Sequence, residues 1–140
     1  MSSLNVNEAK ELEQVKKSFE RCIAQPHFFD DFYERFFKSD KRIPELFKDT
    51  DFNVQRVAIQ HGISYMIMFA EGSKIANAKI ESLSIKHDRN HLNIHPELYD
   101  KWLHALIKTI ELHDKEFNED LKNAWIRILG YVITRIKSRY

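Results

Sequence analysis

The chain has 140 residues, 22 basic and 21 acidic, with a formal net charge of +1 when histidine is neutral. This balance gives no electrostatic reason to expect a nucleic-acid partner. No run approaches the ~18 apolar residues that span a bilayer, which argues against a membrane protein. Three glycines and three prolines argue against a β-sandwich or barrel. We therefore expect one all-α domain over residues 1–140.

The first helix is expected at about residues 6–24, where an apolar stripe includes Cys22. This only cysteine is expected to be inert core and has no partner for an internal disulfide. Met1 to Gln14 contains no apolar block typical of a signal peptide. Both features predict a cytoplasmic protein. The sequence leaves open whether it is a monomer or a homodimer.

Helical periodicity continues to the end of the chain. The remaining helices are expected at about 27–39, 52–71, 73–87, 96–112 and 117–138, with a short piece at 43–47. Asp40 and Asp51 are expected to cap the elements that follow them, and Ser73 opens the next helix after Gly72 ends one. Pro26, Pro44 and Pro96 lie at or near helix starts.

Gly62 and Gly130 fall inside expected helices, where glycine costs about 0.8–1.0 kcal/mol relative to alanine. We expect two helix backbones to approach closely at each. For Gly62, a flat cofactor that needs the space is an alternative explanation.

Histidine is the main candidate for chemistry, because the chain has no Gly-rich phosphate loop and no nucleophile elbow. Ile80, Leu83 and His87 share one helix face, which makes His87 a core or rim histidine, or a ligand. His87, His91 and His95 are spaced by four, which leaves a transition-metal site as an alternative. However, Pro96 and its polar neighbours indicate that the helix has ended before all three can share a face.

Several stretches in this order resemble bacterial globins, most of all single-domain bacterial haemoglobins and the haem domain of flavohaemoglobins. The stretches are Phe32-Tyr33-Glu34-Arg35-Phe36-Phe37, Pro44-Glu45-Leu46-Phe47, Ile85-Lys86-His87, Leu103-His104-Ala105-Leu106-Ile107 and Ala124-Trp125. The resemblance covers almost the whole chain and implies a globin-like helical fold around a haem pocket.

The resemblance also implies non-covalently bound haem b, with His87 as the proximal ligand of the iron. Phe47 matches the phenylalanine that packs on the haem face. Tyr33 and Gln55 match distal residues that contact the bound gas. Ile59 matches the apolar residue one turn after the distal glutamine. The further residues expected at the haem are Arg89 and His91 at the propionates, and Leu92 and Tyr99.

Two features depart from the family pattern. His61-Gly62 resembles the distal His-Gly pair of animal globins, so His61 is a rival distal residue. His61 lies about 240° around the helix from Gln55, so only one of them can face the haem. Tyr99 can serve as the proximal tyrosine of bacterial haemoglobins, but no acid near the C-terminus matches its usual glutamate partner.

These matches imply reversible binding of dioxygen, carbon monoxide or nitric oxide, for transport or storage. At 140 residues the chain is too short for flavin and nicotinamide domains, so nitric oxide detoxification would need an external reductase. The alternative is a gas-sensing or haemless globin-type signalling module. An enzymatic role, as a dioxygenase or a peroxidase-like protein, is less expected, because the missing proximal acid weakens the peroxidase version.

Overall fold

The computed structural model describes residues 5–140, which form seven helices and no strand. The helices are α1 (Val6–Ile23), α2 (Phe28–Ser39), α3 (Arg42–Leu46), α4 (Phe52–Ala70), α5 (Lys74–His87), α6 (Glu97–His113) and α7 (Glu119–Lys137). Every expected helix is present with ends within two residues of the prediction. The all-α prediction is therefore confirmed.

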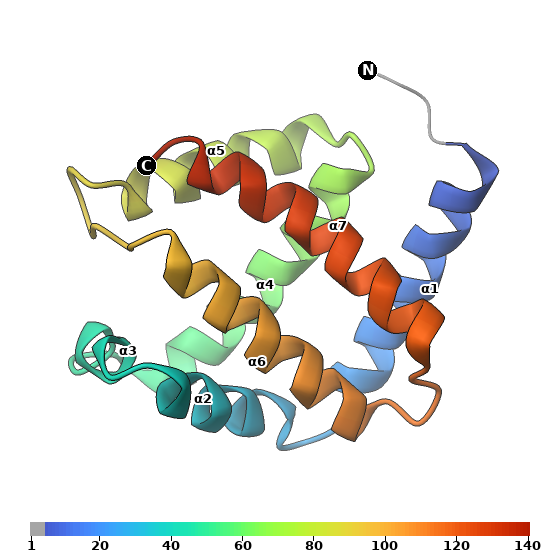
Figure 1. Ribbon diagram of the computed structural model, residues 1–140, viewed down its shortest axis with the longest axis horizontal. Coiled ribbons are helices and arrows are strands. Elements are labelled where there is room, and N and C mark those ends of the chain that lie inside the picture. The colour runs from blue at the N-terminus through green and yellow to red at the C-terminus, as the bar shows by residue number, and fades with distance from the viewer. Residues whose placement is uncertain (1–4) are drawn as a thin grey trace.

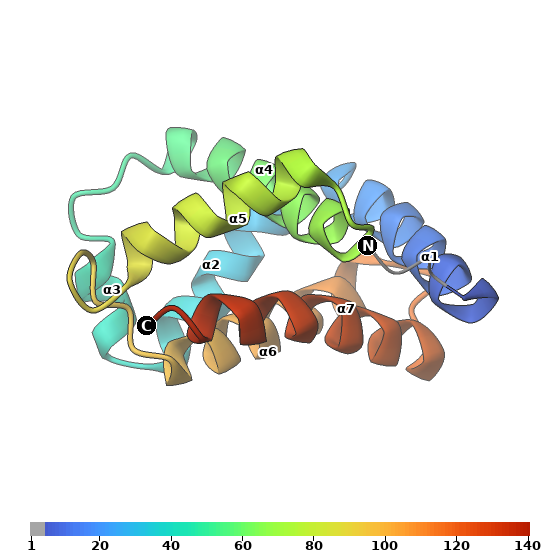
Figure 2. The same ribbon diagram turned by 90° about the horizontal axis from the view of Figure 1, so that it is seen from above.

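The helices form two main layers, with α4 and α5 on one side and α6 and α7 on the other (Figure 2). α1 crosses one end of α7, and α2 packs chiefly on α6 (Figure 1). The C-terminal residue lies beside the loop that joins α5 to α6, because Arg89 of that loop donates a hydrogen bond to the Tyr140 carbonyl at 2.9 Å. The C-terminus of the chain therefore lies close to the end of α5.

The core draws on every helix, and α7 contributes its largest side chain, Trp125, which is fully buried. α2 buries Phe28, Phe32, Tyr33 and Phe36 against this core. Cys22 is also fully buried, and burial raises the pKa of its thiol to about 12. The expectation that Cys22 lies in the core is confirmed.

Local sequence signals fix most helix ends. The Asp51 carboxylate accepts from the Asn53 N–H, and the Ser73 hydroxyl accepts from the Ala76 N–H, so both predicted caps are confirmed. Gly72 ends α4 with φ of 87°, a left-handed conformation that favours glycine. The Asp40 carboxylate accepts from the Arg42 N–H before α3, as expected.

The explanation expected for the two helical glycines is wrong. Apart from its chain neighbours and the backbone of its own helix, a Cβ added at Gly62 or Gly130 would meet no atom within 4 Å, so no second backbone approaches either position. At Gly62 the alternative explanation, space for a flat cofactor, remains a hypothesis.

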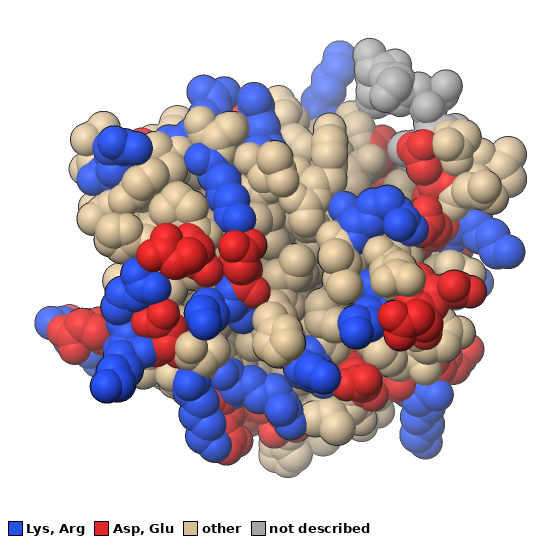
Figure 3. Space-filling model, in the orientation of Figure 1, with Lys and Arg blue, Asp and Glu red and all other residues tan. Residues whose placement is uncertain are grey.

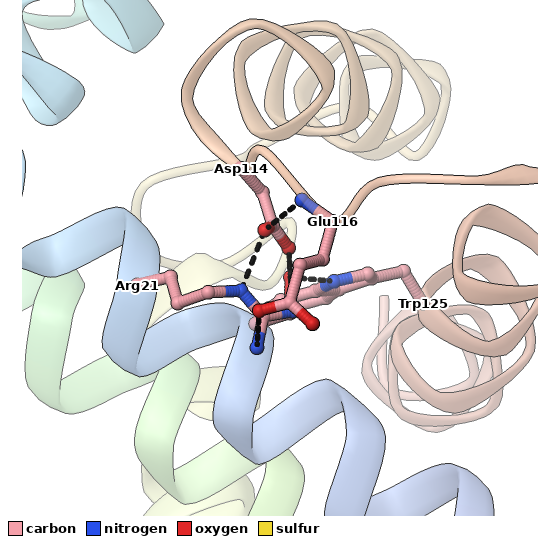
Figure 4. A network of polar contacts seen from close by, with 5 residues as sticks. Arg21, Asp114, Glu116 and Trp125 are labelled. Carbon is pink, nitrogen blue, oxygen red and sulfur yellow. Dashed lines mark hydrogen bonds and ion pairs between the residues drawn. The ribbon is translucent and has the colours of Figure 1, made fainter.

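A buried polar network fastens α1 to the corner between α6 and α7 (Figure 4). The Asp114 carboxylate accepts from Ser18 Oγ at 2.6 Å, from Arg21 Nε at 2.6 Å and Nη2 at 2.9 Å, and from the Glu116 N–H at 3.0 Å. Trp125 Nε1 in turn donates to Ser18 Oγ at 3.0 Å. Every partner in this cluster is therefore satisfied, as a buried charge requires.

The surface seen in Figure 3 intersperses basic and acidic side chains without an extended region of one sign. Within residues 5–140, no helix combines the length and apolarity that crossing a bilayer requires.

Candidate functional site

His87 is the last residue of α5, and its imidazole is partly buried. One turn earlier, Ser84 is buried and bonds back to the Ile80 carbonyl, so this face of the helix turns inward. Across from it, the Tyr99 hydroxyl of α6 lies 3.2 Å from His87 Nδ1. If Nδ1–H donates this bond, Nε2 carries the free lone pair that binds a metal.

Burial controls the protonation of this pair. Burial, with a smaller contribution from the charge of Lys86, lowers the pKa of His87 below its ordinary value. The imidazole is therefore neutral at pH 7, as a ligand must be. Burial also raises the pKa of Tyr99 to about 12, so its hydroxyl stays protonated. Tyr99 has no carboxylate partner among the described residues, which agrees with the absence of a matching acid in the sequence.

The loop after His87 turns its polar residues toward the protein surface. Arg89 lies over the Tyr140 ring at 4.7 Å, and His91 Nδ1 is 2.7 Å from an Asp88 carboxylate oxygen. Leu92 is 60 % exposed. The loop returns to the core at Ile94, whose N–H donates to the His87 carbonyl at 2.9 Å. Haem contacts by Arg89, His91 and Leu92 stay predictions.

On α2 and α4, Tyr33 and Gln55 form a hydrogen-bonded pair. Gln55 Nε2 donates to the Tyr33 hydroxyl at 3.0 Å. Tyr33 is 5 % exposed, and burial raises its pKa to about 12 despite this hydrogen bond. Because the hydroxyl accepts from Gln55, its own hydrogen is available to a further acceptor.

An aromatic cluster surrounds the Tyr33 ring. Phe47, the residue just after α3, lies 5.9 Å from it between ring centres, and Phe52 at the start of α4 lies 5.4 Å away. Phe37 contacts all three of these rings at 5.4–5.7 Å. Phe47 thus belongs to the apolar wall around the Tyr33–Gln55 pair.

The same face of α4 continues through Ile59 and Gly62. Gly62 lies seven residues after Gln55, which returns to nearly the same angle around the helix. Ile59, one turn after Gln55, is 8 % exposed. His61 is exposed and is not hydrogen-bonded to Tyr33. The structure therefore brings Gln55, and not His61, to Tyr33.

These residues fit a haem. The Gln55 face of α4 leaves space at Gly62, where an added Cβ meets nothing within 4 Å. His87 offers a neutral imidazole whose Nδ1 already has a partner, the state expected of a metal-ligating histidine. No group of three or more metal-ligating side chains gathers within the described residues, so the His87, His91 and His95 alternative is wrong.

The globin family model matches residues 30–136, so this chain belongs to the globin family. Globins hold haem iron through a proximal histidine. A solved structure of the Pseudomonas aeruginosa PAO1 protein PA3967, described as structurally highly homologous to a human hemoglobin, is similar to this chain. The two are 37 % identical, with a TM-score of 0.89, over 93 % of this chain and 98 % of that one. No curated protein matches. The expected resemblance to globins is confirmed.

One contact near the candidate site escaped the sequence reasoning. Arg56 Nε donates to an Asp30 carboxylate oxygen at 2.7 Å and joins α4 to α2 next to the Tyr33–Gln55 pair. The opposite charges at 30 and 56 were visible in the sequence, but nothing in it distinguishes them from the other charged residues of the two helices.

Proposed function

We propose that this globin binds one haem b non-covalently through His87 and reversibly holds dioxygen or another diatomic gas. The observation that carries the proposal is the partly buried, neutral His87 with Nδ1 engaged by Tyr99. Tyr99 fixes the ring orientation and leaves Nε2 to ligate the iron. Haem, when bound, would supply an iron centre that binds a diatomic gas.

Tyr33 and Gln55 would be the hydrogen-bond donors for the gas. A bound dioxygen with partial negative charge would be stabilised by a hydrogen bond from the Tyr33 hydroxyl, whose hydrogen is free for a further acceptor. Phe47, Phe52 and Ile59 exclude water around the pair. Carbon monoxide gains less, because it is less polar when bound.

The proposal extends to the protein's role. Transport or storage of dioxygen needs only the site itself, whereas nitric oxide detoxification also needs a reductase as electron donor. We place the protein in the cytoplasm, because its buried Cys22 is a free thiol and forms no disulfide that would need an oxidising compartment. Arg89 and His91 stay the candidates for the haem propionates, and each would then exchange or share its present partner.

The test is the absorption spectrum of the purified protein with and without carbon monoxide. We expect a haem spectrum that shifts on carbon monoxide addition. His87→Ala should abolish or greatly weaken haem retention, while His91→Ala keeps it. A protein that takes up no added haem would instead support the haemless signalling alternative. Retention by His87→Ala, with loss in a His91 or His61 variant, would overturn the proximal assignment.

A further inference from the structure

The first two turns of α4 carry the distal Gln55 but have little burial of their own. From residue 52 to residue 58 every side chain is exposed or only partly buried, and Ile59 is the first buried one. Val54 and Val57 are 65 % and 55 % exposed. A segment with few buried apolar contacts opens locally at low cost. Whatever holds these turns therefore controls where Gln55 lies.

Side chains, and not close backbone packing, join these turns to α2. α4 packs closely on α1, α5 and α7, whereas α2 packs on α1, α3 and α6. Apart from the contacts of Phe52 with Tyr33 and Phe37, two polar contacts bridge α2 and α4. They are the Gln55–Tyr33 hydrogen bond and the neighbouring Asp30–Arg56 ion pair.

We propose that the Asp30–Arg56 ion pair is a latch that holds the first turns of α4 against α2 and keeps Gln55 bonded to Tyr33. Asp30 and Arg56 are then positioning residues, which act on a gas through the distal pair. The inference rests on the proposed function in so far as the latch sets how fast a gas reaches and leaves the site.

The geometry of the latch is specific. Asp30 lies one turn before Tyr33 on α2, and Arg56 directly follows Gln55 on α4, so both links join the same two turns. The Asn53 side chain accepts from Arg56 Nη1 at 2.9 Å, which orients the guanidinium from its own helix. His27 Nδ1 lies 3.6 Å from the other Asp30 oxygen, but it does not reach α4.

Electrostatics agree with this placement. The hydrogen bond from Arg56 lowers the pKa of Asp30 below its ordinary value, so the carboxylate is ionised at neutral pH. Both side chains are about two-fifths exposed, at 41 % and 44 %. An ion pair this exposed shifts an equilibrium only modestly, by about two- to fivefold. That shift matters here because residues 52–58 bury little of their side-chain surface.

The experiment compares Asp30→Asn, Arg56→Gln, the double variant and the conservative Arg56→Lys with the unaltered protein. Glu34→Gln is the matched control, because it removes an ion pair to Lys38 within α2 that does not reach α4. The first measurement, on haem-free protein, is hydrogen exchange at the amides of residues 55–59. The second is carbon monoxide rebinding after flash photolysis of the haem-loaded protein.

We expect exchange and carbon monoxide association to be about two- to fivefold faster in both single charge-removing variants. The double variant should be no faster than either single one, and Arg56→Lys and Glu34→Gln should stay close to the unaltered protein. Faster exchange with unchanged carbon monoxide kinetics overturns the inference, because the pair then stabilises α4 without governing the site. Unchanged exchange, or an equal effect of Glu34→Gln, also overturns it.

The two proposals fail separately. If the unaltered protein takes up no haem, the proposed function fails. Exchange in the haem-free protein then still decides the latch, with faster exchange supporting it and unchanged exchange overturning it. If the unaltered protein binds haem and carbon monoxide but the variants match it, only the latch is lost.

Discussion

Asp114 offers the sharpest test of how this fold is held together, because its one carboxylate joins α1 to the loop between α6 and α7. In Asp114→Asn an amide NH2 replaces one carboxylate oxygen. In the unaltered protein each carboxylate oxygen accepts two hydrogen bonds. Oδ1 accepts from Arg21 and the Glu116 N–H, and Oδ2 accepts from Arg21 and Ser18. In either orientation of the amide, its NH2 group therefore faces hydrogen-bond donors that need an acceptor.

The expected cost follows from these contacts. Hydrogen bonds to a charged group contribute about 1.5–3 kcal/mol each. Leaving one partner of a buried ion pair uncompensated costs about 3–5 kcal/mol. Arg21 is 31 % exposed, so water relieves part of its loss, and we expect a loss of about 3 kcal/mol in the free energy of unfolding.

Urea unfolding of the haem-free protein, followed by tryptophan fluorescence and by circular dichroism, measures this loss. Glu45→Gln is the control, because it removes an exposed ion pair between Glu45 of α3 and Lys48 of the turn that follows, and should cost less than about 1 kcal/mol. An Asp114→Asn protein within about 1 kcal/mol of the unaltered one would refute the reasoning, since the network would then be replaceable by an amide.

The effect should depend on pH in a defined direction. Burial alone would raise the pKa of Asp114, but hydrogen bonds from Arg21 and Ser18 outweigh it and hold the pKa below its ordinary value. The unfolded chain therefore takes up the proton first as pH falls. The stability that the carboxylate contributes is complete above about pH 4–5 and is lost as pH falls through the lower folded-state pKa. The difference from Asp114→Asn should shrink over that range.

The remaining predictions concern the haem site. Tyr33→Phe should speed dioxygen release by several-fold to about tenfold, as loss of a hydrogen bond of about 0.5–1.5 kcal/mol implies, while carbon monoxide release, measured by ligand replacement, changes less; equal release rates would make Tyr33 a packing residue only. Haem should raise the melting temperature, because at a thousandfold excess over the dissociation constant it adds about 4 kcal/mol to the free energy of unfolding. Equal melting temperatures of haem-free and haem-loaded protein would contradict binding to the folded chain. Because burial lowers the pKa of His87, haem should be retained at neutral pH and released only in acid, as the Soret band reports; release above pH 7 would contradict a neutral His87. His61→Ala should leave the spectrum of the gas-free protein unchanged, whereas a change from six- to five-coordinate iron would make His61 the distal residue.

The helices could be predicted because their apolar residues recur with the helical period and their ends carry local signals such as Asp51, Ser73 and Gly72. The choice between Gln55 and His61 could not be made on periodicity alone, because both lie on α4 and each suits a known distal pattern. It depends on which one faces Tyr33 across 22 residues of chain.

Polar contacts between residues far apart in the chain could not be predicted from the sequence for the same reason. Ser18 and Asp114 are 96 residues apart, and Ser18 and Trp125 are 107 apart, so no local pattern relates them. Likewise, the single-residue space at Gly62 depends on what the neighbouring helices leave free. The periodicity shows which face of a helix is apolar, and not what stands opposite it.

The inert thiol of Cys22 makes the chain convenient for spectroscopy. With a pKa of about 12 and no exposed surface, it will not compete for maleimide or methanethiosulfonate reagents. A cysteine introduced at an exposed position such as Val54 would therefore take a spin label or fluorophore alone, with the native residue left in place. A second label at an exposed residue of α2 would then turn the separation of these two helices into a measured distance distribution.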